Sequence, residues 1–350
     1  MNKKILAVAI PAAILAGNVN AFEAYSGDAG SVEVYGQLRA VVQKLENKDV
    51  KLDDGGSRTG VNAFYTVNEN LNVFGTVEYS LSYSDSDSNL KNRLGYMGVS
   101  GDFGQVSFGR LYLTADDLGG IDNSYFYGGS HIIEEQVSGG KHDNAIRYVF
   151  ENDAIYIDAS YALPEDGTSP EVLELFVSKN LAGFDVTAGV STSSQDHDAF
   201  TLNNVAVSAG SIDDLYYTVF AQRSFGDLSV GVQYTASSIE SDATSLELDR
   251  SGYALALNYA VDAKSSLYSG VEFSDYDLKG QTIGTVDKDD LVNVYAGAVH
   301  KFNSFFRVYG EVGYRDGKTP GFSNGNSEWS VGPSAYDGEV RYALGARVYW

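Results

Sequence analysis

The sequence contains no cysteine, so no disulfide bond can form and the fold must be stable without covalent cross-links. It also lacks a proline- or serine-rich linker, an abrupt change of composition and a long block of like charge, which are the usual marks of a domain boundary. One continuous domain is therefore the simplest organisation for these 350 residues.

Basic residues are few in this chain. Lys and Arg number 24 against 47 Asp and Glu, which gives a formal net charge of -23. Such an acidic chain is a poor ligand for nucleic-acid phosphates, and we expect no nucleic-acid partner. High acidity alone also fits a protein that stays soluble in a salty medium, so the positions of the acids matter more than their number.

Long apolar runs are missing except near the start of the chain. There Lys3 and Lys4 precede the apolar stretch 5–16, and the small residues of Val19-Asn20-Ala21 follow it. This order is typical of a secretory signal peptide, whereas a spanning helix needs roughly 20 apolar residues and this stretch is interrupted by Pro11. We predict a signal peptide over 1–21 and one domain over 22–350, with a net charge near -25 once the two lysines are removed.

Tyrosine and glycine, by contrast, are abundant, with 25 Tyr and 38 Gly, and both suit strands and tight turns. Apolar and polar residues alternate over long segments such as 71–83, 252–261 and 305–315. The chain ends in RYALGARVYW, in which one face carries Tyr342, Leu344, Ala346, Val348 and Trp350. A period of two predicts β-strands whose two faces meet different surroundings.

The connections between these strands alternate in length. Seven short ones fall near residues 67, 101, 151, 179, 225, 262 and 302. Eight long ones, acidic and rich in Ser and Gly, fall over 46–57, 84–91, 113–141, 163–170, 193–214, 238–250, 278–289 and 316–337. Together they join sixteen strands, and an even number of antiparallel strands with short turns on one side indicates an outer-membrane β-barrel.

A soluble β-sandwich or β-propeller also has many short strands. Neither explains the regular separation of short and long connections, and the sequence has no internal repeat of blade length. In a barrel, the row from Tyr342 to Trp350 faces lipid, and Arg341 and Arg347 face a watery lumen. Closure then requires the last strand to pair with the first, at 32–45, because an open edge in lipid leaves backbone groups unpaired.

The chain resembles the general diffusion porins of Gram-negative outer membranes, in particular the acidic trimeric porins of marine and enteric bacteria. The resemblance covers essentially the whole mature chain and rests on segments whose order and spacing match that family: VYGQLRA (34–40), SRTGVNAF (57–64), VEY (77–79), RLGYMGVSGDFGQVSFGRLY (93–112) and the aromatic end. It implies a homotrimer in outer-membrane lipid and lipopolysaccharide. It also implies that the terminal aromatic, here Trp350, belongs to the signal read by the barrel-assembly machinery, with Tyr342, Leu344, Ala346 and Val348 on the same strand.

Sixteen strands enclose a lumen too wide for side chains to fill, so an aqueous channel follows. By resemblance, the longest loop, 113–141, folds inward and narrows it, and its acids Asp116, Asp117 and Asp122 are expected to face bases on the wall. The resemblance assigns wall positions to Arg58, Arg93, Lys141 and Glu78, and strand parity adds Arg39 and Arg147. Opposed charges across a narrow pore create a transverse field that orients solutes. Each charge has the alternative of a solvated lumen position away from the narrowest point.

Two departures from the family pattern bear on this constriction. Tyr125-Phe126-Tyr127-Gly128-Gly129-Ser130 replaces a common Pro-Glu-Phe-Gly-Gly-Asp run, and Gln37 stands where Lys is common. A weaker field and a more aromatic constriction are expected. The three aromatics leave two interpretations, a stacking track for sugars or packing anchors for the loop.

The predicted function is passive diffusion of ions and small hydrophilic solutes, with a preference for cations because of the acid excess, and without any cofactor or metal. Acids in the outer loops that bind divalent cations shared with lipopolysaccharide would leave the selectivity modest. A solute-specific porin, a barrel enzyme and an adhesin are the alternatives. The four histidines, His131, His142, His197 and His300, show no spacing that resembles a catalytic triad.

Overall fold

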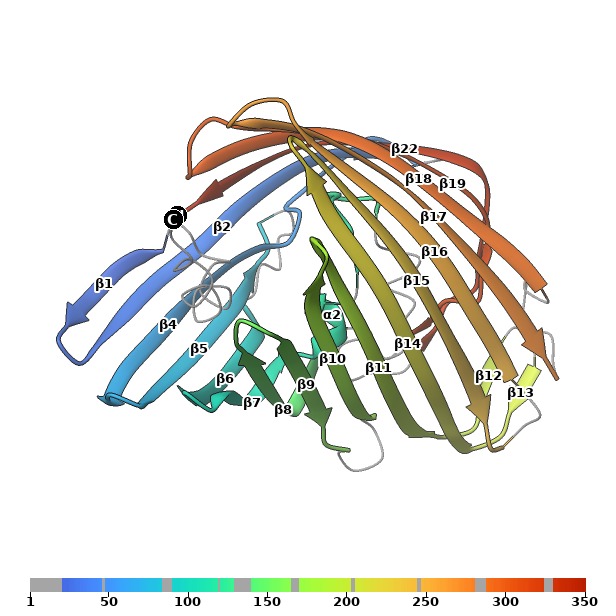
Figure 1. Cartoon of the computed structure of the whole chain (residues 1–350). Coiled ribbons are helices and arrows are strands. Elements are labelled where there is room, and N and C mark those ends of the chain that lie inside the picture. The colour runs from blue at the N-terminus through green and yellow to red at the C-terminus, as the bar shows by residue number, and fades with distance from the viewer. Residues whose placement is uncertain are drawn as a thin grey trace.

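The computed structural model describes residues 21–45, 48–83, 90–118, 120–128, 140–164, 170–202, 205–243, 247–280, 288–323 and 330–350. The predicted signal peptide lies almost wholly outside the described residues, as do parts of the long loops. The described chain forms one curved antiparallel sheet that encloses a lumen (Figure 1). Within these residues no helix is both long and apolar enough to cross a membrane.

The main sheet has 18 strands in the described part of the chain, and sixteen of them form the barrel wall. These are β2 (Gly30–Lys44), β4 (Ser57–Asn68), β5 (Leu71–Leu81), β6 (Lys91–Gly101), β7 (Gly104–Tyr112), β8 (Lys141–Glu151), β9 (Tyr156–Ala162), β10 (Glu171–Leu181), β11 (Phe184–His197), β14 (Gly210–Phe225), β15 (Leu228–Ser241), β16 (Glu247–Ala260), β17 (Ser265–Lys279), β18 (Lys288–Lys301), β19 (Phe306–Thr319) and β22 (Ser334–Tyr349). The predicted strand count is confirmed.

Smaller elements accompany the wall. Strands β1 (Phe22–Gly27) and β3 (Lys51–Asp53) pair with β2. Two short hairpins, β12 (Phe200–Leu202) with β13 (Val205–Val207) and β20 (Phe322–Ser323) with β21 (Ser330–Val331), lie in long connections. One short helix, α2 (Thr114–Leu118), begins the connection between β7 and β8.

Strand β2 closes the barrel by pairing with two other wall strands. Its second half, from Gln37 to Lys44, pairs with β22, and its first half, from Gly30 to Gln37, pairs with β4. Beyond the ladder, the backbones of Gly36 and Trp350 exchange hydrogen bonds of 2.9 and 3.1 Å. The predicted pairing of the last strand with the first is confirmed.

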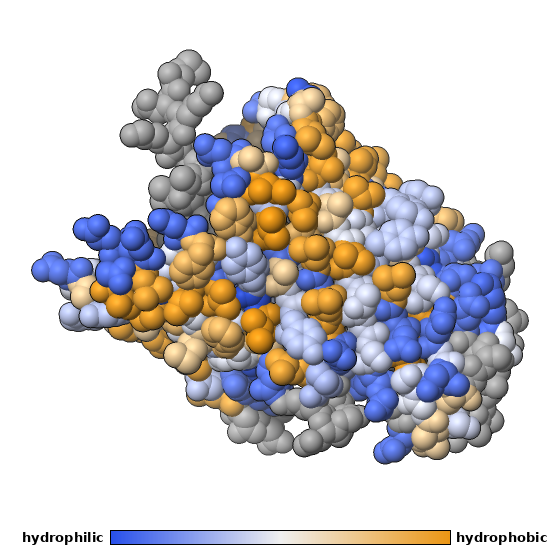
Figure 2. All heavy atoms as spheres, turned by 60° about the horizontal axis from the view of Figure 1, so that its bottom comes forward, coloured by the Kyte–Doolittle hydropathy of each residue, from blue (hydrophilic) through white to orange (hydrophobic). Residues whose placement is uncertain are grey.

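The two faces of the wall separate as the alternation predicts. On β22, Leu344 is 64% exposed on the outside, whereas Arg341 is 6% exposed on the inside. Trp350 lies half-buried over Gly36, where an added Cβ would come within 2.2 Å of the indole. Figure 2 shows apolar side chains gathered across the middle of one outer face, with hydrophilic residues towards its ends. This distribution suits a wall with lipid outside and water inside.

The short connections fall where the sequence predicts them. They join β4 to β5, β6 to β7, β8 to β9, β10 to β11, β14 to β15, β16 to β17 and β18 to β19, all at one end of the barrel. The turn after β16 is typical of this end, because the Asp262 carboxylate accepts the backbone N–H groups of Lys264 and Ser265 at 2.7 and 2.8 Å. These two bonds hold the pKa of Asp262 below its usual value.

Candidate pore constriction

The connection between β7 and β8 enters the lumen at helix α2 and is fixed there to the inner wall. The backbone N–H of Thr114 donates to Ser160 Oγ at 3.1 Å, and the Thr114 hydroxyl donates to Asp158 Oδ1 at 2.8 Å. The N–H of Ala115 donates to Glu174 Oε2 at 2.8 Å. Because Asp158, Ser160 and Glu174 face inward from β9 and β10, the free N–H groups at the start of the helix are satisfied by the wall. Figure 1 shows α2 inside the barrel.

The middle of this loop reaches a different part of the wall. The N–H of Ile121 donates to Gln233 Oε1 of β15 at 3.2 Å, and the Ile121 side chain lies against Gly231. An added Cβ at Gly231 would come within 3.1 Å of Ile121 Cβ, so the small residue lets the loop approach closely.

The aromatic segment Tyr125–Tyr127 is packed against β17, β18 and β19. Glu311 of β19 accepts the N–H groups of Tyr125 and Tyr127 at 2.8 and 2.6 Å and the Tyr268 hydroxyl at 2.7 Å. Tyr125 stacks on Tyr309 with ring centroids 4.4 Å apart, and Tyr127 is only 3% exposed. Of the two interpretations of this segment, the packing supports an anchor and not a stacking track for sugars.

The loop therefore crosses the lumen from β9 and β10 to β19. On the wall opposite, a first charge cluster joins three strands. Arg93 of β6 forms an ion pair with Glu78 of β5 and donates to the Tyr112 hydroxyl. Arg58 of β4 lies 3.9 Å from the same carboxylate, which also accepts the Tyr35 hydroxyl at 3.0 Å.

Arg93 reaches this cluster because of a β-bulge. The register between β5 and β6 shifts at this point, so that Glu78 faces Leu94 and Tyr79 faces Asn92. The extra residue, Arg93, has no partner in the ladder, and a bulge of this kind re-aims a side chain. Arg58, Arg93 and Glu78 are thus brought together.

A second cluster joins the loop to the wall. Arg147 of β8 binds Asp158 through two hydrogen bonds of 2.9 and 2.6 Å and also forms an ion pair with Asp117 of α2. Two parallel bonds between a guanidinium and a carboxylate fix both groups in position. Lys141 Nζ and the guanidinium carbon of Arg93 each lie 5.1 Å from the centre of the Tyr112 ring.

Asp116 lies in the field of Lys141 and Arg93 and beside Asp117. Although its carboxylate is open to the lumen, the surrounding barrel reduces its solvation, and the neighbouring Asp117 adds like charge. Both effects raise the pKa of Asp116 to about 6, although the nearby bases act in the opposite direction. This acid changes charge close to neutral pH.

Of the remaining predicted site residues, Asp122 lies apart from these clusters and Arg39 lies beside the first one. Asp122 accepts the N–H and hydroxyl of Ser124 at 2.7 and 3.0 Å, so it shapes the loop and does not face the wall bases. Its burial raises its pKa. Arg39 donates to Gln37 Oε1 and to the Gly55 carbonyl, both at 3.0 Å, next to Arg347 and Arg58.

Four residues of this region are missing from the sequence-based set of site residues. Arg347 lies over the Tyr125 ring at 4.5 Å, and Arg307 donates to the Tyr125 hydroxyl at 3.3 Å. Asp158 contacts the start of the loop, and Glu311 contacts its aromatic segment. Parity places all four on inner faces, but no local pattern shows which inner residues meet a loop.

Comparison with known proteins agrees with this architecture. The profile of the family described as Gram-negative porin matches residues 6–320. The chain belongs to this porin family. Porin-like protein H of Photobacterium profundum is 29% identical over 90% of this chain and 95% of its own length. A major outer membrane protein of Pasteurella multocida is 25% identical over 95% of this chain and 98% of its own.

A solved relative extends the comparison to three dimensions. OmpT, an outer membrane protein of Vibrio cholerae in a trimer form, is 33% identical, covers 92% of this porin with its whole length and superposes with a TM-score of 0.79. The porin is therefore a β-barrel channel of the bacterial outer membrane, and not an enzyme. Within the described residues, no group of three or more histidines or acids is placed to hold a metal ion.

Proposed function

We propose that this porin is a general diffusion channel through which ions and small hydrophilic solutes pass down their gradients, with a preference for cations. One observation supports this most directly. The loop between β7 and β8 brings Asp116 into the lumen within the field of Arg93 and Lys141 of the wall, while Asp117 forms an ion pair with Arg147. Charges of opposite sign on two sides of a water-filled passage orient dipolar solutes and act on ions.

The proposed constriction is formed by the loop 113–141 and its facing wall. Its members are Arg58, Arg93, Arg39, Lys141, Arg147, Asp116, Asp117, Asp122 and Glu78. Carboxylates offset part of this positive charge, since Arg58 and Arg93 share Glu78, and Arg147 pairs with both Asp158 and Asp117. The first cluster therefore keeps one positive charge and the second one negative charge, and Asp116 adds a further negative charge at the loop, which favours cations.

The side of the lumen near β22 carries positive charge, which favours anions. Arg39 and Arg347 lie close to one another, and Arg347 stacks on aromatic rings. We propose that these arginines set up the transverse field, while the excess of 25 acids over the mature chain determines which ions accumulate at its mouths.

The experiment is single-channel recording of the refolded porin in a planar bilayer, with the reversal potential measured across a tenfold KCl gradient. Large stable steps with a potential on the cation side are expected. A potential near zero, or on the anion side, would overturn the cation preference. A folded barrel without conductance would overturn the diffusion channel itself.

The trimer form of the related OmpT leads us to propose a homotrimer for this porin, surrounded by outer-membrane lipid and lipopolysaccharide. Conductance steps in groups of three, and a trimer mass by light scattering in detergent, are expected. A monomer mass with single steps would contradict the trimer.

Export and assembly complete the proposal. Residues 1–21 act as a signal peptide, and strand β1 begins directly after them at Phe22. The outward row Tyr342, Leu344, Ala346, Val348 and Trp350 is proposed as the signal read by the barrel-assembly machinery. Amino-terminal sequencing of porin from outer membranes should begin at Phe22, and an intact Met1 would contradict the cleavage.

A further inference from the structure

A cavity of about 170 Å³ opens on the inner wall near the short-turn end, away from the candidate constriction. It is lined by Ser31 and Glu33 of β2, Asn62, Ala63 and Phe64 of β4, Phe74, Gly75 and Thr76 of β5, Ser100 of β6 and Gln105 of β7. Short turns of outer-membrane barrels lie on the periplasmic side. A solute that enters the cell therefore reaches this cavity after it has passed the constriction and before it leaves the channel on the periplasmic side.

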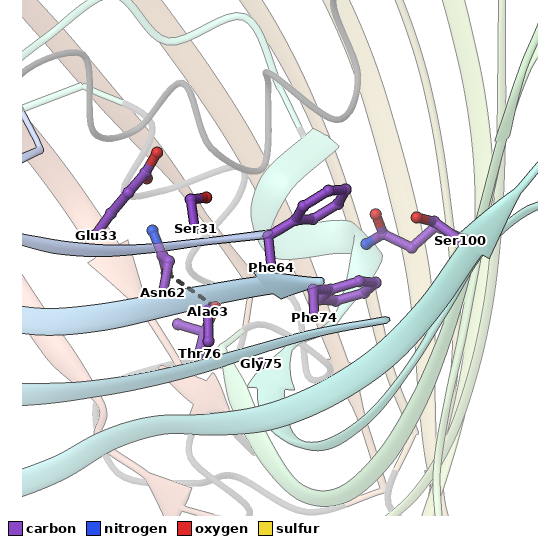
Figure 3. A pocket seen from close by; sticks show the side chains of 10 residues that line it. Ser31, Glu33, Asn62, Ala63, Phe64, Phe74, Gly75, Thr76 and Ser100 are labelled. Carbon is purple, nitrogen blue, oxygen red and sulfur yellow. Dashed lines mark hydrogen bonds between the residues drawn. The ribbon is translucent and has the colours of Figure 1, made fainter. Parts of the chain in front are cut away.

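One end of this cavity holds an unused hydrogen-bond donor. Asn62 is 7% exposed, its Oδ1 accepts the Thr76 hydroxyl at 3.0 Å, and its Nδ2 is buried without a partner in the described structure. Figure 3 shows this nitrogen pointing towards the side of the cavity that carries Glu33 and Ser31. A buried donor without a partner costs about 1–3 kcal/mol, so a group that accepts from it is favoured.

The other end of the cavity is aromatic. The rings of Phe64 and Phe74 lie on the same side of their strands, as Figure 3 shows. Phe74 extends over Gly98 of β6, where an added Cβ would come within 2.5 Å of the ring. The glycine thus leaves room for the ring to lie close to the wall, and an apolar surface is presented beside the polar end.

The volume of the cavity and its polar side chains limit which ligand it can bind. A cavity of about 150 Å³ accommodates one benzene molecule, so a space of this volume suits one six-membered ring. The polar end offers a donor, the Asn62 amide, near an acceptor, the Glu33 carboxylate. A hydroxyl group both accepts and donates, whereas an ammonium group only donates and would leave Asn62 unpaired.

We propose that this cavity, which we call the exit site, binds a single sugar ring, with the C–H face of the ring on Phe64 and Phe74 and its hydroxyls at Asn62 and Glu33. The exit site rests on the proposed function only in that sugars must be able to cross the channel. It slows a sugar at the periplasmic mouth, after the step at which the constriction selects by size and charge.

The experiment is saturation-transfer NMR with methyl α-D-glucoside on the detergent-solubilised porin, together with conductance of the same preparation. Saturable binding is expected for the wild type. Because one hydrogen bond contributes about 1 kcal/mol, N62L should weaken binding about fivefold, and F64L should weaken it as well. The matched control is N258L, on the inner face of β16 near the same end of the barrel, which should bind like the wild type.

Each outcome separates the two proposals. A folded, conducting wild type without saturable binding, or equal binding in N62L, F64L and N258L, would overturn the exit site and leave the diffusion channel intact. Binding of benzylammonium in place of the glucoside would overturn the sugar ligand. Absence of conductance with glucoside binding retained would overturn the diffusion channel and the role of the exit site in passage, and would leave only a cavity that binds a sugar ring.

Discussion

At the residue scale, the lumen differs from a soluble core in holding many charges close together. Arg147 illustrates how they are accommodated, because it meets Asp158 through two hydrogen bonds and Asp117 through an ion pair. Breaking such a pair by removing one member leaves the other unpaired, which costs more than the pair contributes. The charges that can be altered with least damage to the fold are those outside such pairs, and Asp116 is one.

Asp116 leads to a prediction about pH. Since its pKa is raised to about 6, it is ionised at pH 7.5 and largely protonated at pH 5. The cation preference should therefore fall as the pH is lowered through 6, and D116N should resemble the acidified wild type at every pH. Reversal potentials at pH 7.5 and 5 test this, with D153N in an exposed short turn as the control of equal charge change. An unchanged pH response in D116N would assign the titration to another group.

His142 leads to a second prediction at this scale. Its side chain is 1% exposed, and both ring nitrogens are buried without a hydrogen-bond partner in the described structure. Replacing an unsatisfied buried polar group by an apolar one of similar size is neutral or stabilising. H142L should raise the free energy of unfolding of the barrel, measured in urea, by about 1 kcal/mol.

The control for this substitution is H300L. Nδ1 of His300 lies 3.0 Å from Ser265 Oγ, and its ring packs edge-on against Phe302, so this variant should lose stability. A loss of stability in H142L would show that a partner such as an ordered water satisfies its ring. Urea titration in detergent or lipid, followed by near-ultraviolet circular dichroism, measures both variants.

At the element scale, the loop between β7 and β8 is tied to the wall at both described ends. The Glu311 carboxylate accepts two loop N–H groups and the Tyr268 hydroxyl, so E311A removes the partner of three donors at once. Each buried donor left unpaired costs about 1–3 kcal/mol, which favours release of the aromatic segment from the wall. The barrel ladder does not use this side chain, so the fold should persist.

We expect E311A to conduct with larger current noise than the wild type and to be cut by protease within the loop. The control E247A removes an exposed carboxylate that pairs with Lys279 at 2.6 Å, far along the chain from the loop contacts, and should leave the noise unchanged. Quiet, protease-resistant E311A channels would show that the remaining contacts of Tyr125 and Tyr127 suffice.

The elements also show what sequence reasoning can reach. The sixteen strands, the seven short turns and the closing pair were predictable because alternation and turn composition are local signals. The anchors of the loop were not, since Glu311 lies 184 residues from Tyr127 along the chain. Arg93 was placed by resemblance, and the bulge that turns it inward follows from the register between two strands, which the sequence of either strand does not contain.

At the scale of the whole molecule, the barrel depends on a sheet without free edges. Every wall strand has two neighbours, and β22 fills the last gap between β19 and β2. In lipid an unpaired strand edge leaves backbone N–H and C=O groups without any partner. The final strand therefore contributes to stability well beyond its own packing.

A chain that ends at Pro333 tests this dependence. Without β22, the new edges on β2 and β19 would run parallel, because each is antiparallel to the missing strand, and their hydrogen-bond pattern would have to change for a fifteen-stranded barrel to close. We expect no folded band whose mobility shifts on heating in gel electrophoresis.

W350A keeps the whole ladder and loses only the indole over Gly36, so it should refold in detergent yet reach the outer membrane in lower amount if Trp350 is part of the assembly signal. A truncated chain that folds and conducts would show that fifteen strands close without the last one, and W350A at wild-type levels in the membrane would remove the indole from the signal.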